Sequence, residues 1–428
     1  MRRQYFAELD ETLCSCRLEN GLTVKVVPKP GFTRKLVYFA TDFGSIHTAF
    51  ELDGVQHQVP MGVAHFLEHK MFELPDRDVM AEFAALGGSV NAFTSFDMTA
   101  YYFSCTENFE KNLQLLLEFV STPWFTQESV QREYGIIDQE IAMNEDTPDS
   151  REFSTLMQKM YREHPVREEI LGTRESIRQI DADTLYLCHR AFYTPDNMIL
   201  CVVGDVDANE VARIAEAVLG REYRPAAKKL RNWQEEMVCD TQPILLQQEV
   251  AMPTFQISFK CSPAGRGADA LRTDVVGYLA AEVLLGESSP LYLQLYEEGV
   301  IDSSFGGSFE TIDGCAMLSC GGDGDQAEAV RQAILERGAY LAEHGLEEQA
   351  FLRLKRGAVG RRIRDLDSFD AVCYRLCAYH FLEYDYFGFP AVYAEVTKEQ
   401  VRAFLAEVVC PGRCAMAITE PMDHTEDQ

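Results

Sequence analysis

The most informative segment of this chain reads Gly62-Val63-Ala64-His65-Phe66-Leu67-Glu68-His69. In a helix, His65 and His69 share one face, because residues four apart are separated by about 6 Å along the axis. Two imidazoles placed in this way can bind one zinc ion, with about 2.0–2.1 Å between the metal and each nitrogen. Glu68 lies on the same side, where it can take a proton from a water that the metal activates. The residue order inverts the commoner histidine motif of zinc hydrolases, and the inverted order is itself a zinc signature.

The neighbours of this motif are apolar, which favours a metal site over a helix that merely exposes its histidines to solvent. Burying two imidazoles and a carboxylate is costly unless another group satisfies them, and a metal ion does so. The apolar residues of the segment are Val63, Ala64, Phe66, Leu67, Met71 and Phe72.

A catalytic zinc site has three protein ligands and one open position, so another element must supply the third ligand. The predicted helix Gln127–Met143 offers Glu133 and Glu140, which lie on nearly the same face. We predict that Glu140 is the ligand and that Glu133 orients a histidine or the water from outside the ligand set. The alternative for both glutamates is a solvated helix face. An apolar stripe indicates that the helix is packed: Ile136, Ile137 and Ile141.

The segment from Gly87 to Thr94 predicts a short strand that begins with glycines. Such glycines allow close backbone approach, and an exposed strand edge can pair with an extended peptide. We expect Asn91, Ala92 and Phe93 to hold a peptide in this way. The alternative is an ordinary edge strand.

The composition is that of a globular protein. The chain has 428 residues, of which 46% are hydrophobic and 25% charged, so it can form two or three domain cores. A formal net charge of −29 disfavours binding to nucleic acid or to an anionic membrane surface. The sequence predicts neither a secretory signal nor a membrane span. Thirteen cysteines without a CxxC pair favour reduced, buried thiols and a cytoplasmic protein.

The same order of predicted elements occurs twice: two strands, two helices, two strands and two helices. We infer two homologous domains, 1–222 and 243–428, joined by a polar linker at 223–242. The alternative is a chain whose halves alternate helices and strands without being duplicates. The predicted elements of the first half are Gly21–Val27, Lys35–Thr41, Gly62–Phe72, Asp78–Leu86, Ser89–Phe93, Thr99–Cys105, Phe109–Val120 and Gln127–Met143. Those of the second half are Ile244–Val250, Thr254–Cys261, Asp269–Leu285, Leu291–Glu298, Ser304–Phe309, Ala316–Cys320, Gln326–Glu343 and Glu347–Arg364.

These motifs resemble the pitrilysin/insulinase family of zinc metallopeptidases, which carries the inverted HxxEH motif and includes the mitochondrial processing peptidases. The resemblance covers nearly the whole chain. It implies an α+β (α/β layered) fold: two homologous domains, each with a mainly antiparallel sheet flanked by helices, which form half of a clamshell. It also implies a zinc-dependent endopeptidase that cleaves short or unfolded peptides, with Zn²⁺ on His65, His69 and Glu140 and with Glu68 as the base. Besides 62–69, the matching segments are 87–94 with Thr99 and Tyr101, Glu133 with Glu140, Tyr193–Met198 and Val202–Asp205.

The second half departs from the family pattern, in which an arginine and a later tyrosine hold the substrate carbonyl and the developing oxyanion. Tyr296 occupies the arginine's place, and Phe305 stands near the tyrosine's. A phenol supplies no fixed cation, and Phe305 donates no hydrogen bond. The chain thus resembles the zinc-bearing subunit of two-subunit bacterial members, so we expect a paralogous partner that supplies both residues, with a homodimer as the alternative. Aligning the halves sets Lys355 and Arg362 opposite the paired glutamates, so we expect the second domain to be metal-free.

Two other functions fit the same sequence. One is a non-catalytic assembly subunit, and the other is a dedicated maturation protease for one peptide. Cobalt or manganese could also occupy a ligand set of this kind.

Overall fold

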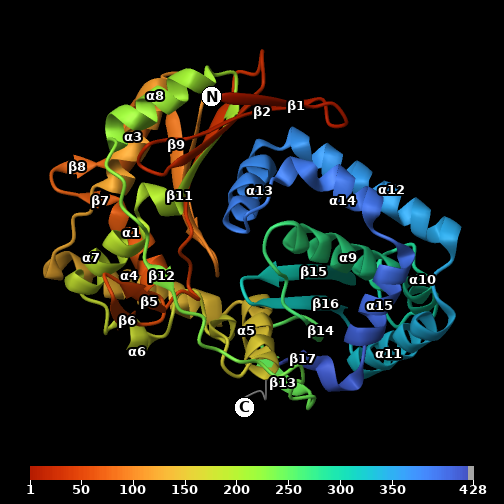
Figure 1. Ribbon diagram of the computed structural model, residues 1–428. Helices are drawn as coiled ribbons and strands as arrows, with labels where there is room; N and C mark the ends of the chain where they lie inside the picture. The colour runs from red at the N-terminus through yellow and green to blue at the C-terminus, as the bar shows by residue number, and fades with distance from the viewer. Residues whose placement is uncertain (423–428) are drawn as a thin grey trace. The chain divides into compact units, whose positions relative to one another are not determined.

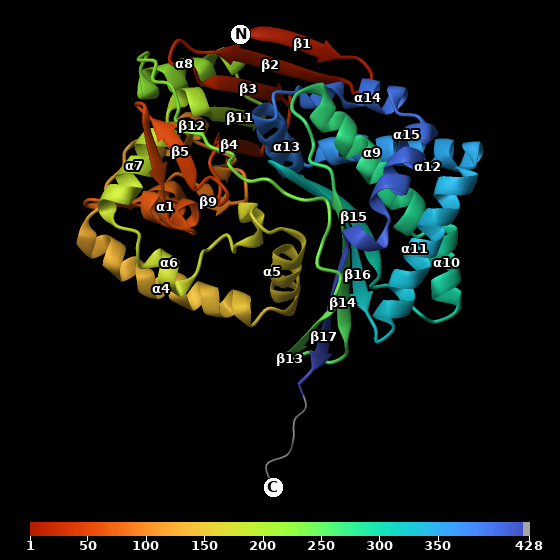
Figure 2. The same cartoon turned by 60° about the horizontal axis from the view of Figure 1, so that its bottom comes forward.

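The computed structural model describes residues 1–422, which fall into two compact units. The first unit contains Met1–Ile141, Glu169–Asn232 and Arg362–Phe387. The second contains Ala142–Glu168, Trp233–Arg361 and the described residues from Gly388 onward. Figures 1 and 2 show the elements of each unit from two directions.

Within the described residues, the first unit is built on a seven-stranded sheet. In spatial order its strands are β1 (Arg2–Phe6), β2 (Glu11–Arg17), β3 (Thr23–Pro28), β11 (Met198–Gly204), β4 (Lys35–Thr41), β10 (Thr99–Cys105) and β9 (Gly88–Thr94). β11 pairs in parallel with β3, and the other neighbouring strands pair antiparallel, which confirms the mainly antiparallel sheet. Every residue of β11 is buried, as expected for a central strand with helices on both faces.

Helices cover both faces of this sheet. Their bounds are α1 (Val63–Met71), α2 (Val79–Ala85), α3 (Phe109–Ser121), α4 (Gln127–Glu145), α6 (Arg174–Ile177), α7 (Ala182–Phe192), α8 (Ala208–Leu219) and α13 (Phe369–Phe381). Alternate residues of β10 face opposite sides. The Tyr101 ring lies 5.8 Å from that of Phe119 on α3, whereas Tyr102 lies 6.3 Å from Phe93, which in turn contacts Tyr374 on α13. Figure 1 shows α3 and α13 on opposite sides of the sheet.

The second unit repeats this strand order within the described residues. In spatial order its sheet contains β13 (Ile244–Gln248), β17 (Cys414–Pro421), β14 (Thr254–Cys261), β16 (Cys315–Asp323) and β15 (Gly306–Ile312). β17 pairs in parallel with β13 and antiparallel with β14, as β11 does with β3 and β4. The matching topology confirms the predicted fold class of two related α+β domains.

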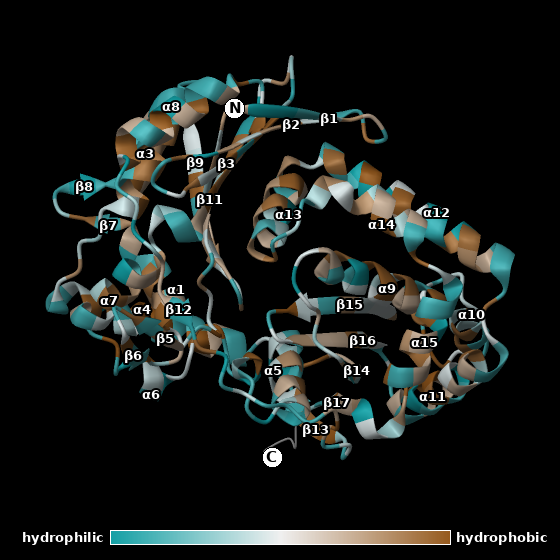
Figure 3. Cartoon of the chain, viewed as in Figure 1, coloured by the Kyte–Doolittle hydropathy of each residue, from teal (hydrophilic) through white to brown (hydrophobic). Residues whose placement is uncertain are grey.

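Helices also lie on both faces of the second sheet. They are α5 (Pro148–Met160), α9 (Ala268–Leu285), α10 (Pro290–Glu297), α11 (Ala327–His344), α12 (Glu348–Arg364), α14 (Phe389–Glu395) and α15 (Lys398–Val408). α5 packs on β17 and β14, and α9 packs on β15. Hydrophilic and hydrophobic residues are interleaved along α8 and α12 (Figure 3), as expected for helices that bury one side. Nowhere in residues 1–422 is a helix both long and apolar enough to cross a membrane.

Two helices at equivalent places in the two halves of the sequence each belong to the unit formed mainly by the other half. α5 follows α4 in the first half but belongs to the second unit, whereas α13 follows α12 in the second half but belongs to the first. The chain also changes unit between Asn232 and Trp233, inside the segment predicted as a linker. The domain limits 1–222 and 243–428 follow the chain order and remain a prediction.

Candidate metal centre

Helix α1 begins at a glycine that other residues could not replace without strain. Gly62 has φ 84°, and a Cβ added there would lie 2.3 Å from the carbonyl oxygen of Leu171. Only glycine combines this backbone conformation with such a close approach. Along the helix, the rings of His65 and His69 lie side by side, with 4.5 Å between their centroids. Gly62 thus lets α1 begin in close contact with the backbone of Leu171, three residues before His65.

Helix α4 brings Glu140 to the two histidines. Its Oε2 atom lies 3.5 Å from Nε2 of His65 and 3.5 Å from Nε2 of His69. One possible ligand atom from each of the three residues lies within 4.8 Å of the others. In a tetrahedral zinc site with bonds of about 2.1 Å, ligand atoms are about 3.4 Å apart. The two distances from Glu140 to the histidines thus match the spacing of ligands around a zinc ion.

The donor set also has the composition of a catalytic site rather than a closed structural one. Two imidazole nitrogens and one carboxylate oxygen leave a fourth tetrahedral position for water or substrate. The side chain of His65 is 8% exposed, whereas that of Glu140 is 38% exposed, so Glu140 is the more accessible of the two. Among the described residues, Nδ1 of His65 has no hydrogen-bond partner. Binding of a metal by the other ring nitrogen, Nε2, would give this buried ring a polar interaction.

Glu133 lies behind the second imidazole. Its Oε1 atom is 3.0 Å from Nδ1 of His69. When Nδ1–H donates to this carboxylate, Nε2 carries a lone pair directed towards Glu140. Burial lowers the pKa of His69, but the hydrogen bond and the charge of Glu133 outweigh it and raise the pKa above its ordinary value. The structure thus places Glu133 against a histidine and away from the converging ligand atoms.

The carboxylate of Glu68 is held by strand β9. Oγ1 of Thr94 donates to Oε2 of Glu68 over 2.6 Å, and it lies 3.3 Å from Oγ1 of Thr99. Burial raises the pKa of Glu68, and the hydrogen bond from Thr94 opposes this shift. A carboxylate with a raised pKa is suited to transferring protons near neutral pH. Sequence reasoning missed this role for Thr94, because a threonine in a strand does not reveal which group it will bond.

Strand β9 forms one edge of the first sheet, and no described strand pairs with its outer side. Asn91 is exposed, and Ala92 and Phe93 are partly exposed. Since Thr94 at the end of this strand contacts Glu68, a peptide added along β9 would run past that carboxylate. The edge strand and the candidate metal centre are therefore adjacent parts of the first unit.

In the second unit, Tyr296 and Phe305 occupy the positions where the sequence departs from the family pattern. Tyr296 is 51% exposed and its ring stacks on that of Tyr292. Phe305 is buried, with its ring 6.4 Å from that of Phe255. Neither side chain provides a guanidinium group, and Phe305 serves packing.

Comparisons with known proteins agree with this fold. Residues 56–174 match the model for insulinase (peptidase family M16), and residues 179–358 match the model for the peptidase M16 inactive domain. The chain belongs to the insulinase family of peptidases, M16.

Several relatives are similar over the full length. The chain is 36% identical to the uncharacterized zinc protease YmfH of Bacillus subtilis strain 168, covering 97% of this chain and 98% of that protein. It is 33% identical to an M16-like peptidase from Alicyclobacillus acidocaldarius, with a TM-score of 0.92 and coverage of 96% and 99%. A protease from Helicobacter pylori, 20% identical with a TM-score of 0.81 and coverage of 96% and 99%, shares the fold.

Proposed function

We propose that this chain is a zinc-dependent endopeptidase that cleaves short or unfolded peptides. The observation that carries the proposal is the position of one oxygen of Glu140 at 3.5 Å from Nε2 of both His65 and His69. A merely solvated glutamate has no reason to adopt this position between two imidazoles. The relative YmfH, which is named as a zinc protease, supports zinc as the metal.

The two histidines and Glu140 would hold the zinc ion, which when bound supplies a Lewis acid for activating water and polarising a carbonyl. Glu68 accepts a proton at its carboxylate and returns it to the leaving amine. Thr94 keeps that carboxylate in place through its 2.6 Å hydrogen bond.

The edge of β9 would hold the substrate in an extended form. Backbone pairing along Asn91, Ala92 and Phe93 makes few demands on sequence, because the hydrogen bonds come from the main chain. This mode of binding suits unfolded peptides, whose backbone groups are available for pairing.

Metal content and peptide cleavage, measured on the same preparations, test the proposal. Glu140→Gln is expected to lose stoichiometric zinc, whereas Glu68→Gln keeps the zinc and loses hydrolysis by at least about 100-fold. Glu128→Gln on the same helix is the matched control, because its side chain is 85% exposed, and it should change neither quantity. Stoichiometric zinc in Glu140→Gln would overturn the assignment.

We further propose that full activity needs a second chain that supplies an arginine and a tyrosine. Tyr296 and Phe305 occupy the corresponding places here and provide neither a cation nor, in the case of Phe305, a donor. The chain alone should cleave unstructured peptides slowly, and adding a paralogous chain should restore the rate. Full turnover without a paralogue, by a monomer or by a homodimer as checked by light scattering, would contradict this, because a second copy of the chain has the same Tyr296 and Phe305.

Two comparisons separate the alternatives. Biological activity unchanged by Glu68→Gln would favour a non-catalytic assembly subunit, and a strong preference for one precursor peptide would favour a maturation protease. A cytoplasmic location is supported by the thirteen cysteines, all of which lie in the described residues and form no disulfide there.

A further inference from the structure

A lysine is completely buried beside the candidate metal centre. Lys70 follows His69 on α1, and its side chain is 0% exposed. Burying an ammonium group costs several kcal/mol unless it is paired and hydrogen-bonded. A methionine would fill similar space without that cost, so packing does not explain the charge.

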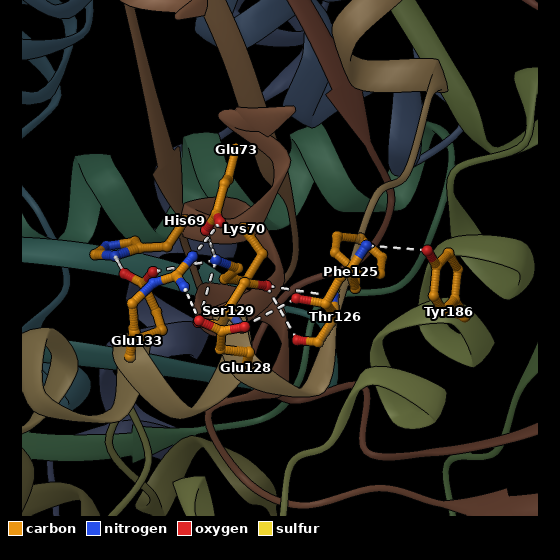
Figure 4. A network of polar contacts seen from close by, with 10 residues as sticks. His69, Lys70, Glu73, Phe125, Thr126, Glu128, Ser129, Glu133 and Tyr186 are labelled. Carbon is orange, nitrogen blue, oxygen red and sulfur yellow. Dashed lines mark hydrogen bonds and ion pairs between the residues drawn. The ribbon is translucent and has the colours of Figure 1, made fainter. Parts of the chain in front are cut away.

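The ammonium group of Lys70 has three partners, which Figure 4 shows. It forms an ion pair with Oε2 of Glu73, lies 3.4 Å from the carbonyl oxygen of Ser129, and lies 3.5 Å from Oε2 of Glu133. Glu73 and Ser129 belong to different elements from Lys70, since β7 spans Glu73–Leu74 and Ser129 lies on α4. The lysine therefore links α1, β7 and α4 at one point.

The two oxygens of Glu133 have different partners. Oε2 faces Lys70, and Oε1 lies 3.0 Å from Nδ1 of His69. The side chain of Glu133 is only 12% exposed, so water does little to hold it. With Oε2 held by the lysine, the carboxylate presents its other oxygen to the imidazole.

We propose that Lys70 is a positioning residue for the metal centre, acting through Glu133 on the orientation of His69. The inference rests on the proposed zinc site and adds a residue that neither binds the metal nor contacts substrate. Outer partners of ligating histidines commonly change metal affinity by about 10- to 100-fold when they are removed. Lys70 acts one step further from the metal than Glu133.

A second role is open to the same lysine, because a link between three elements could be purely structural. The two roles differ in what they predict for Arg132, which binds Oε1 of Glu73 over 2.7 Å and so belongs to the same network. The Arg132 side chain is 58% exposed, and its recorded ion pairs are with Glu73 and Glu128 rather than with the carboxylate of Glu133. A purely structural network would respond to either residue, whereas the positioning role depends on Lys70.

The test compares Lys70→Met with Arg132→Met. Transfer of zinc to a chromophoric chelator measures the zinc affinity, and the visible spectrum of the cobalt-loaded protein reports the geometry of the ligands. Lys70→Met is expected to weaken zinc binding by about 10-fold or more and to alter the cobalt spectrum. Arg132→Met should leave the zinc affinity within about twofold of the wild type and the cobalt spectrum unchanged. Thermal unfolding of the metal-free proteins checks that both variants fold.

A double variant examines the route through Glu133. If Lys70 acts through that carboxylate, Lys70→Met combined with Glu133→Gln should bind zinc no more weakly than Glu133→Gln alone. Losses that add, an unchanged affinity in Lys70→Met, or an equal loss in Arg132→Met would each overturn the inference. Should Lys70→Met fail to fold, Lys70→Gln takes its place with the same outcomes. Failure of the wild type to bind zinc would instead overturn the proposed function.

Discussion

The hydroxyl of Thr94 connects the proposed substrate strand to the proposed catalytic base. It donates to Glu68 over 2.6 Å from the end of β9, so one side chain joins the edge strand to the proposed acid-base group. The carboxylate of Glu68 is buried. A carboxylate that rotates freely points its lone pairs at the attacking water less often than one held by a hydrogen bond. At this scale the site depends on orientation as much as on residue identity.

Replacing Thr94 by valine should therefore slow catalysis without releasing the metal. We expect Thr94→Val to lower kcat by about 10-fold, with zinc content unchanged, because Glu68 loses its fixed hydrogen bond. Steady-state kinetics on an unstructured peptide, together with metal analysis, measure both effects. Ser89→Ala, an exposed position on the same strand, serves as the control. Loss of zinc in Thr94→Val would show instead that the threonine holds the fold of the site.

At the scale of elements, a buried ion pair attaches the segment after Asn232 to the rest of the second unit. Lys260 on β14 lies 2.7 Å from Glu235, and their side chains are 2% and 10% exposed. The same carboxylate accepts hydrogen bonds from the backbone N–H groups of Arg162, Glu163 and His164. Burial opposes ionisation of Glu235, but these donors outweigh it and lower its pKa to about 2.

This pair predicts a pH-dependent stability. The pKa of Glu235 is lower in the folded than in the unfolded chain, so its contribution is complete above about pH 4.5 and is lost as pH falls towards 2. Glu235→Gln should lower the free energy of unfolding by about 3 kcal/mol at pH 7, because Lys260 loses its charged partner and keeps the carbonyl oxygen of Met160 as its hydrogen-bond acceptor. The difference between wild type and variant should narrow below pH 4.5, as measured by denaturant titration.

The neighbouring glutamate provides the matched control. Glu236 lies 3.7 Å from Arg162, and both side chains are at least 70% exposed. Since exposed ion pairs contribute little, Glu236→Gln should leave stability unchanged across this pH range. Equal effects of the two substitutions would refute the role assigned to the buried pair.

At the scale of the whole molecule, the chain forms two compact units with the same sheet topology but different chemistry. All three converging ligand atoms belong to the first unit, on α1 and α4. At the places aligned with the paired glutamates, the second half has cations that make other contacts: Lys355 bonds the carbonyl oxygen of Val396, and Arg362 bonds the hydroxyl of Tyr379. The candidate ligands therefore lie in the first unit, and the second half of the sequence has cations where the first half has the paired glutamates.

This division predicts where metal binding changes the dynamics of the chain. Adding zinc to the metal-free protein should slow amide hydrogen exchange in α1 and α4, because the ion joins these two helices. The strands β14 and β16 of the second unit should exchange at the same rate with and without zinc. Mass spectrometry of peptic fragments reports both, and Glu140→Gln should abolish the response. Protection that appears only in the second unit would contradict the location of the site.

Much of the fold and of the candidate site could be predicted, because the informative signals are local. Helical spacing put His65, Glu68 and His69 on one face of α1, and each predicted helix and strand is present with ends shifted by a few residues. Several described elements were not predicted, among them the strands β1, β2, β11 and β17. β1 is mostly exposed, so its sequence has no buried alternation to reveal it.

The sequence by itself determined the residue types, their spacing on α1 and the repeated order of elements, since hydrophobic periodicity and side-chain chemistry act over a few residues. Only the tertiary structure decided that Glu140 reaches both imidazoles, that Thr94 holds Glu68, and that Lys70 is buried against Glu133. These contacts join residues from separate elements, and their distances depend on how α1, β9 and α4 pack. The same holds for α5 and α13, because nothing in the chain order states which sheet a helix will cover.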